Sequence, residues 1–230
     1  MKKIIAVLQK GTLITLPFIL LMGVVLIIFE PWYLSFEYQN KNFPADPYGF
    51  TISERLNYGI ISLNYVFKGL PDNTLADLKK ADGSALYNER ELSHMKDVKN
   101  VFQNAKKVWK ILLLFDAVLF VLALLRPELR SGFLDALKKG SVLTGICLFV
   151  ILIFTFTSFD SLFEHFHELF FKEGTWLFYE SDSLIRLYPE KLWVDGFIWA
   201  AVLTLLFSLI VFMAANFGLK KQKNNYSEKC

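Results

Sequence analysis

The chain has 230 residues, of which 54% are hydrophobic and 16% aromatic, and its formal net charge is +3. This apolar fraction exceeds the roughly 45 to 50% that is usual in soluble proteins, so the composition favours a membrane protein. The excess of basic over acidic residues lies in the segments that flank the apolar stretches on the expected cytoplasmic side, so no basic patch with interleaved aromatics predicts nucleic-acid binding.

Four segments approach the roughly 20 apolar residues that are needed to cross a hydrocarbon core about 30 Å thick. They are residues 11–29, 108–125, 141–159 and 196–217. The first follows a basic start, but its apolar run is long and ends without an A-x-A-like cleavage site, so we expect a retained signal anchor. The sequence therefore predicts an all-α integral membrane protein with four transmembrane helices.

Basic residues predict the orientation of these spans. Segments 1–10, 126–140 and 218–230 hold three, four and four Lys or Arg residues, against three acidic residues in total. An excess of Lys and Arg marks cytoplasmic loops. We therefore expect both termini to be cytoplasmic, and segments 30–107 and 160–195 to form a mostly helical extracytoplasmic domain.

The first extracytoplasmic segment changes character near residue 51. Residues 30–50, with several prolines and alternating aromatics, predict irregular or short extended structure. A helix is expected to begin near Thr51 or Ser53 and to continue through "ERLNYGIISLNYVF". Its apolar face is compatible with the lipid interface or with packing inside the extracytoplasmic domain, and both interpretations stay open.

The stretch "LYNERELSHMKDVKNVFQNAKKVWKILLL" predicts one long helix that continues into the second span. At 100° per residue, Arg90, His94, Asp97 and Val101 fall on one flank of its apolar stripe. We therefore expect His94 to lie between apolar packing and charged neighbours, where its pKa can be tuned.

The stretch "FEHFHELFF" holds the other two histidines, His165 and His167. Its apolar face is expected to continue the third span outward, and His167 shares a flank with Asp160 and Glu164. His165 is two residues from His167 and points to another side of a helix, so we expect it to serve packing or to face solvent.

Several established site patterns are absent from the sequence. "HELFF" lacks the second histidine of the H-E-x-x-H zinc motif, and neither a G-x-S-x-G elbow nor a glycine-rich phosphate loop occurs. We expect no metal and no cofactor, although His94, His167 and a carboxylate brought together by folding would suffice for a metal ion. Cys147 and Cys230 are not expected to form a disulfide.

Asp116 is a carboxylate roughly 9 Å inside the second predicted span, given the 1.5 Å helical rise per residue. An acid at this depth is costly and is a functional candidate. A polar contact to a neighbouring helix explains it equally well.

Three features occur together in this chain: four predicted spans, the stretch "YNERELSHMKDVKNVF" before the second span, and the stretch "FHELFFKEGTWLFYESDSLIRLYPEKLW" between the third and fourth. In this combination the chain resembles the bacterial lipoprotein intramolecular transacylase family. The resemblance covers nearly the whole chain. It implies a cell-membrane enzyme whose active site is on the outer face. Such an enzyme moves the sn-2 acyl chain of a diacylglyceryl-modified lipoprotein to the α-amino group of the N-terminal cysteine, which gives a lyso-form lipoprotein.

The resemblance also implies which residues act. The paired histidines of the family correspond to His94 and His167, which would supply acid–base catalysis without a covalent intermediate. Candidate supporting or substrate-binding residues are Tyr87, Asn88, Arg90, Glu91, Asp97, Asp160, Glu164 and Trp176. The expected partners are lipoprotein substrates and membrane lipid, with no obligate protein partner.

One alternative of another class stays open, namely a non-enzymatic membrane sensor or assembly factor whose outer domain docks a partner. The two interpretations differ in geometry, because an enzyme requires His94 and His167 to face each other.

Overall fold

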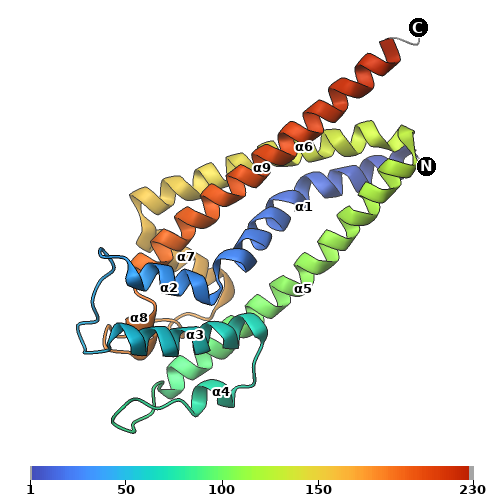
Figure 1. Ribbon diagram of the computed structural model, residues 1–230. Helices are drawn as coiled ribbons and strands as arrows, with labels where there is room; N and C mark the ends of the chain where they lie inside the picture. The colour runs from blue at the N-terminus through green and yellow to red at the C-terminus, as the bar shows by residue number, and fades with distance from the viewer. Residues whose placement is uncertain (1, 228–230) are drawn as a thin grey trace. The chain divides into compact units, whose positions relative to one another are not determined.

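The computed structural model describes residues 2–227, with side chains for 7–224. Position 1 and residues 228–230, which include Cys230, lie outside the described residues. The described part folds into nine helices: α1 (Lys2–Ile28), α2 (Pro31–Gln39), α3 (Ile52–Lys68), α4 (Asn73–Ala76), α5 (Glu89–Leu125), α6 (Pro127–Thr157), α7 (Phe159–Phe170), α8 (Ser183–Leu187) and α9 (Glu190–Ser227). Its only extended pairing is an isolated bridge between Lys79 and Ala85, which confirms the all-α prediction for these residues (Figure 1).

The predicted spans 108–125 and 196–217 lie within long helices, whereas 11–29 and 141–159 run one and two residues past the ends of α1 and α6. Four helices in the described part of the chain are long and apolar enough to cross a membrane, namely those over Val7–Ile28, Glu89–Leu125, Pro127–Thr157 and Glu190–Asn224. The segment expected to connect the second and third spans is itself helical from Pro127 onward, since proline is favourable in the first turn of a helix.

The described residues form two compact units, which we call the span unit (2–25, 107–153 and 199–227) and the site unit (26–106 and 154–198). Polar contacts tie the helices of the span unit together. Thr12 Oγ1 donates to Asp116 Oδ1 at 2.7 Å, and Ser208 Oγ donates to the Ser141 carbonyl at 2.9 Å. Asp116 therefore makes the interhelical contact that was one of its two expected roles.

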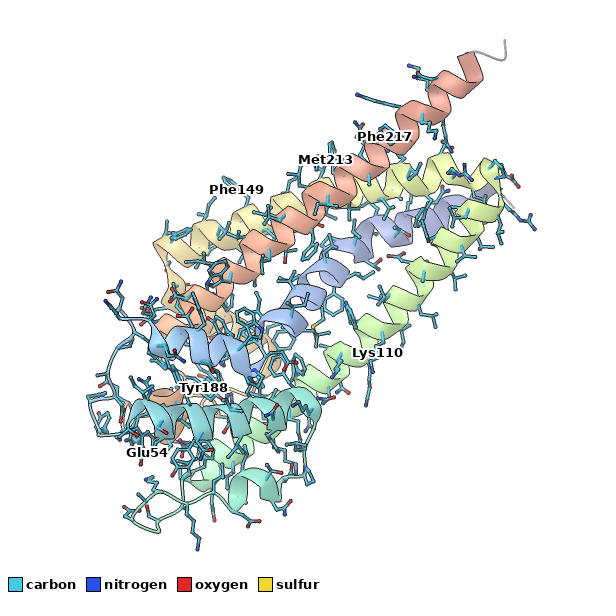
Figure 2. All side chains as sticks on the ribbon, viewed as in Figure 1. Glu54, Lys110, Phe149, Tyr188, Met213 and Phe217 are labelled. Atoms are coloured by element: carbon cyan, nitrogen blue, oxygen red, sulfur yellow. The ribbon has the colours of Figure 1, made fainter. Side chains whose placement is uncertain are left out.

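The helices of the span unit expose large apolar side chains. Phe149, Met213 and Phe217 point away from their helices (Figure 2) and are 65%, 53% and 70% exposed. Cys147 is also exposed on α6. Apolar exposure on this scale is costly in water, whereas it costs nothing against lipid chains, so these faces fit the prediction of a membrane protein.

α2 corrects the expectation of irregular structure after the first span. Pro31 occupies the first turn of α2, where its missing N–H costs no helical hydrogen bond. Trp32 Nε1 donates back to the Ile27 carbonyl at 3.0 Å. The prolines at 44 and 47 do lie in non-helical chain, so the prediction was wrong only for residues 31–39.

α3 is the central helix of the site unit and packs against α2, α4 and α8 (Figure 1). It begins where the sequence indicates, because Thr51 and Glu54 form a reciprocal capping box, and it ends at Gly69 with φ 69°. Its buried face joins an apolar cluster formed by Tyr58, Tyr65, Val66, Leu75, Leu86, Tyr87, Met95, Leu184 and Leu187. The packing alternative for this helix is therefore the one that the structure adopts.

The segment that carries the expected outward continuation of the third span is a separate helix, α7. α6 ends at Thr157, and Ser158 has a non-helical backbone with φ −161° and ψ 65°. α7 then begins as a separate helix and belongs to the site unit. The hydrophobic periodicity of the sequence continued across this break, so it could not reveal the change in direction.

Candidate active site

The start of α5 fixes the position of His94, which lies in its second turn. Asn88 Oδ1 accepts from the Glu91 N–H at 3.0 Å, and Glu91 Oε2 accepts from the Asn88 N–H at 2.7 Å. This reciprocal pair satisfies two N–H groups at the beginning of the helix. Glu91 Oε1 also accepts from the Leu184 N–H at 2.7 Å, so one buried carboxylate joins α5 to α8.

Asp182 joins the same helix start to an aromatic loop. It accepts from Asn88 Nδ2 at 3.1 Å, from Arg90 Nη2 at 2.8 Å and from the Tyr179 N–H at 2.9 Å. The Arg90 guanidinium also lies over the rings of Phe178 and Tyr179, at 5.3 and 5.1 Å from their centroids. Arg90 therefore positions Phe178, which packs against His94.

A tight turn after α7 positions Trp176. α7 ends at Phe170, and the N–H of the next residue, Phe171, donates to the His167 carbonyl at 2.8 Å. Thr175 then donates through N–H and hydroxyl to the Lys172 carbonyl, and Gly174 takes φ 78°. This left-handed conformation is one that glycine adopts without steric cost, and it returns the chain so that Trp176 packs on His167.

The two histidines meet inside a cluster of aromatic rings. His94 is 6% exposed and His167 is 9% exposed, and their ring centroids are 6.0 Å apart at an interplanar angle of 23°. The ring centroids of Phe171 and Phe178 lie 5.0 and 5.2 Å from that of His94. The facing pair that the enzyme interpretation required is therefore present.

His167 has the larger number of ring neighbours. Its centroid is 4.1 Å from that of Phe163, 5.0 Å from Trp176 and 5.6 Å from Phe171. Aromatic walls of this kind exclude water and lower the local dielectric, which strengthens polar interactions between the site and a bound molecule.

Hydrogen bonding defines the tautomer of His167. Its Nδ1 lies 2.7 Å from the Phe163 carbonyl oxygen, and a carbonyl oxygen can only accept, so Nδ1 carries the proton. When the ring is neutral, Nε2 is therefore the basic nitrogen. His94 differs, because its Nδ1 is buried without a hydrogen-bond partner among the described residues.

Burial keeps both imidazoles neutral at neutral pH. Desolvation, with a smaller contribution from His167, lowers the pKa of His94 from 6.5 to about 4. His94 precedes residues 108–125, the predicted span in α5. Desolvation also lowers the pKa of His167, and its hydrogen bond to the Phe163 carbonyl opposes that shift. In a neutral pair, one ring can accept a proton and the other can donate a hydrogen bond.

The carboxylates expected beside the histidines lie elsewhere. Asp97, Asp160 and Glu164 are exposed, and the described structure gives none of them a contact with His94 or His167. The expected charged neighbours were wrong because helical spacing identifies a shared flank but not a shared contact. His165 is exposed and contacts the Ser161 carbonyl through Nδ1 at 2.6 Å, as expected for a histidine outside the pair.

The remaining predicted residues either contact the histidine pair or support the segments that carry it. Trp176 contacts His167 directly, whereas Asn88, Arg90 and Glu91 support the elements that carry the pair. Tyr87 is buried and shares a 2.7 Å hydrogen bond with Ser62. It therefore belongs to the apolar cluster on α3.

A metal ion finds no ready ligand set in the described part of the chain, where no three His, Cys, Asp or Glu side chains come together. The combination of His94, His167 and a carboxylate, which the sequence left open, is thus not assembled there.

Sequence reasoning missed Phe163, Phe171, Phe178 and Asp182. The apolar face of the segment around His167 was expected, but the sequence did not show that the rings of Phe163, Phe171 and Phe178 pack against the histidines. Asp182 is more than 90 residues from Arg90 in sequence, and no local pattern links the two positions.

A first prediction concerns Glu91, whose role here is support. Glu91→Ala removes two acceptors and leaves the buried Leu184 N–H unpaired, so it is expected to lower the free energy of unfolding by about 1 to 3 kcal/mol. Thermal unfolding of the purified protein in detergent measures the effect. Glu89→Ala removes an exposed acid from the same helical turn as the control. Equal melting temperatures for the two variants would contradict this role.

Comparison with known proteins finds similarity over nearly the whole chain. Residues 10–193 match the family model of the lipoprotein intramolecular transacylase Lit. An uncharacterized protein of Aquifex aeolicus (strain VF5) is 32% identical over 224 residues, which cover 96% of this chain and 97% of that protein.

Solved structures show the same fold. The in meso structure of the membrane integral lipoprotein intramolecular transacylase Lit from Bacillus cereus has a TM-score of 0.73 at 18% identity and covers 96% of this chain and 97% of that chain. A variant of that enzyme with one histidine replaced by arginine has a TM-score of 0.69 at 19% identity, with 97% and 94% covered.

Proposed function

This chain belongs to the lipoprotein intramolecular transacylase family, and we propose that it transfers the sn-2 acyl chain of a diacylglyceryl-modified lipoprotein to the α-amino group of the N-terminal cysteine. The product is a lyso-form lipoprotein with an N-acylated cysteine and a monoacylglyceryl group. The observation that carries the proposal is the buried pair of His94 and His167, whose ring centroids are 6.0 Å apart in an aromatic site.

The chemistry requires no enzyme nucleophile, since donor and acceptor belong to one molecule. The α-amine attacks the sn-2 ester carbonyl and forms a cyclic tetrahedral intermediate. Loss of one amine proton and collapse of the intermediate form the amide bond and break the ester bond. The released sn-2 oxygen takes a proton and becomes a hydroxyl. The enzyme contributes proton transfer, charge stabilisation and the alignment of two ends of one substrate.

The tautomer of His167 favours the role of general base. Its Nδ1 proton is held by the Phe163 carbonyl, so Nε2 is free to accept the proton that the attacking amine loses. His94, which is also neutral, donates a hydrogen bond to the ester carbonyl oxygen or to the departing sn-2 oxygen, and His167 then returns the proton to that departing oxygen. Each proton-transfer group typically contributes about 10² to 10⁴-fold to the rate.

The aromatic surroundings support transfer rather than hydrolysis. Phe163, Phe171 and Phe178 line the histidines with apolar surface, and water excluded from the site cannot compete with the amine for the ester. Phe166, Leu169 and Phe170 on α7 are exposed and offer apolar contact to acyl chains. We place the site at the outer face of the bacterial cell membrane, with both termini cytoplasmic.

The direct test uses purified enzyme in detergent–lipid micelles and a synthetic diacylglyceryl-cysteine peptide with different sn-1 and sn-2 acyl chains. Substrate and product have equal masses, so fragmentation by tandem mass spectrometry must locate each chain. The proposal predicts the sn-2 chain on the cysteine nitrogen. A folded enzyme that leaves both chains on glycerol would contradict it and would favour the sensor or assembly factor.

The lowered pKa values predict the pH dependence of this reaction. The α-amine, with a pKa of about 7.7 to 8.0, must lose its proton before attack, so the logarithm of the rate rises with pH at a slope of one below that value. Burial lowers the pKa of His167 below the ordinary histidine value of 6.5. Protonation of this ring therefore doubles the slope only at pH values below 6.5. A steady-state pH profile between 5 and 8.5 measures both limbs. A slope of two that is already established at pH 6.5 would contradict neutral burial.

Acid stability provides the control for that profile. A buried histidine with a lowered pKa binds fewer protons folded than unfolded, so the protein loses stability as pH falls below 6.5 toward about 4, the pKa of His94. Each acid sample should therefore recover its full rate after return to pH 8.

A further inference from the structure

Trp176 differs from three other tryptophans in how its indole N–H is used. Trp32 donates to the Ile27 carbonyl, Trp109 to the Ile19 carbonyl and Trp193 to the Tyr188 carbonyl, at 3.0, 3.0 and 3.1 Å. The Nε1 of Trp176 is buried and has no acceptor within the part of the chain that the structure describes. A buried indole N–H usually finds a partner, so this one is free to serve a bound molecule.

The position of Trp176 places this donor in the candidate active site. Its ring centroid lies 5.0 Å from that of His167, with an angle of 34° between the ring planes. The turn over residues 172–175, with Gly174 at φ 78°, fixes the backbone immediately before it. The indole is thus held by a structured turn and by packing against the ring of the base.

The proposed reaction needs such a donor. The ester carbonyl oxygen becomes an oxyanion in the tetrahedral intermediate, and fixed donors aimed at that oxygen stabilise it. Arg90 cannot readily serve, because its guanidinium pairs with Asp182 at 2.8 Å and covers Phe178 and Tyr179. An indole nitrogen only donates, so it can stabilise the oxyanion without competing for the amine proton.

We propose that Trp176 Nε1–H donates a hydrogen bond to the carbonyl oxygen of the sn-2 ester and to the oxyanion formed from it. This inference rests on the proposed function. The N–H bond stays intact throughout, and the proton of the amine still passes to His167. Trp176 is then a catalytic residue in addition to the two histidines.

The test separates the N–H from the ring. Trp176→Phe keeps an aromatic side chain without a donor, and 3-benzothienylalanine at position 176 replaces only the N–H by sulfur. Single-turnover rate constants with enzyme in excess are expected to fall about 10² to 10³-fold in both variants, as for removal of one oxyanion donor. The enzyme concentration giving half the maximal rate should change little. Trp32→Phe, at an exposed tryptophan of the same unit whose N–H is already bonded, should keep the wild-type rate.

The possible results separate a failure of the donor role of Trp176 from a failure of the proposed transacylase function. A folded benzothienylalanine variant with the wild-type rate constant would overturn the donor role while leaving the transacylase proposal intact. A variant that changes only the half-maximal enzyme concentration would also overturn it, because the residue would then bind ground state and transition state equally. A folded wild-type enzyme that moves no acyl chain would overturn both proposals.

Discussion

His167→Ala is expected to lower the rate of acyl migration by about 10² to 10⁴-fold, the usual contribution of one proton-transfer group. The loss follows from geometry, because Nδ1 is hydrogen-bonded to the Phe163 carbonyl and Nε2 is the free basic nitrogen. Rate constants are measured with the synthetic lipopeptide by following the N-acylated fragment over time.

His165→Ala is the matched control for this variant. It removes a histidine from the same helix, but that imidazole is exposed and its hydrogen-bond contacts are to Ser161 of its own helix. We expect its rate to stay within a few-fold of wild type. If the two alanine variants lose activity equally, or if His167→Ala keeps the wild-type rate while folded, the assignment of His167 as base is wrong.

Replacement of His94 is expected to have an effect of similar size. His94→Phe preserves an aromatic ring among Phe171, Phe178 and His167 while removing both nitrogens. The rate should fall about 10² to 10⁴-fold, because the reaction then lacks a donor for the carbonyl or for the leaving oxygen. Melting temperature and single-turnover rate should both be measured, since only the rate is expected to change strongly.

The double variant with His94→Phe and His167→Ala tests whether the histidines act together. Groups that serve one transition state are not additive, so the double variant should be little slower than the slower single variant. Losses that multiply in full would indicate that the two rings act independently and would contradict a joint site.

Sequence periodicity predicted the helices of the site unit well where one face of the segment is buried. α5 follows the expected stripe, with Met95 buried and His94 beside it, and α3 begins at the Thr51 capping box. These predictions succeeded because the capping box and the apolar stripe depend only on residues within one or two helical turns. The same local information sufficed to separate His165 from His167.

Features that depend on contacts between distant segments could not be predicted in the same way. Asp160 and Glu164 share the flank of His167 on a helix, yet the imidazole is desolvated and hydrogen-bonded to its own backbone. The break at Ser158 interrupts an apolar pattern that itself continues. Asp182, which joins Arg90 to the aromatic loop, had no signal near Arg90 in the sequence.

These contacts explain why the pair is neutral rather than charged. A carboxylate beside either ring would favour the imidazolium form, whereas aromatic walls penalise it. The structure surrounds the rings with aromatic side chains, and both histidine pKa values are lowered mainly by burial. A neutral pair suits a reaction in which a proton is first accepted and later returned.

Intramolecular transfer is the central claim, and a crossover measurement tests it most directly. Two lipopeptides are mixed with the wild-type enzyme, one with a deuterated sn-2 chain on a heavy-isotope peptide and the other without labels. Tandem mass spectrometry then reads which chain each peptide nitrogen carries. Transfer within one substrate predicts only heavy chains on heavy peptides and light chains on light peptides, whereas mixed products would show transfer between molecules and contradict the account.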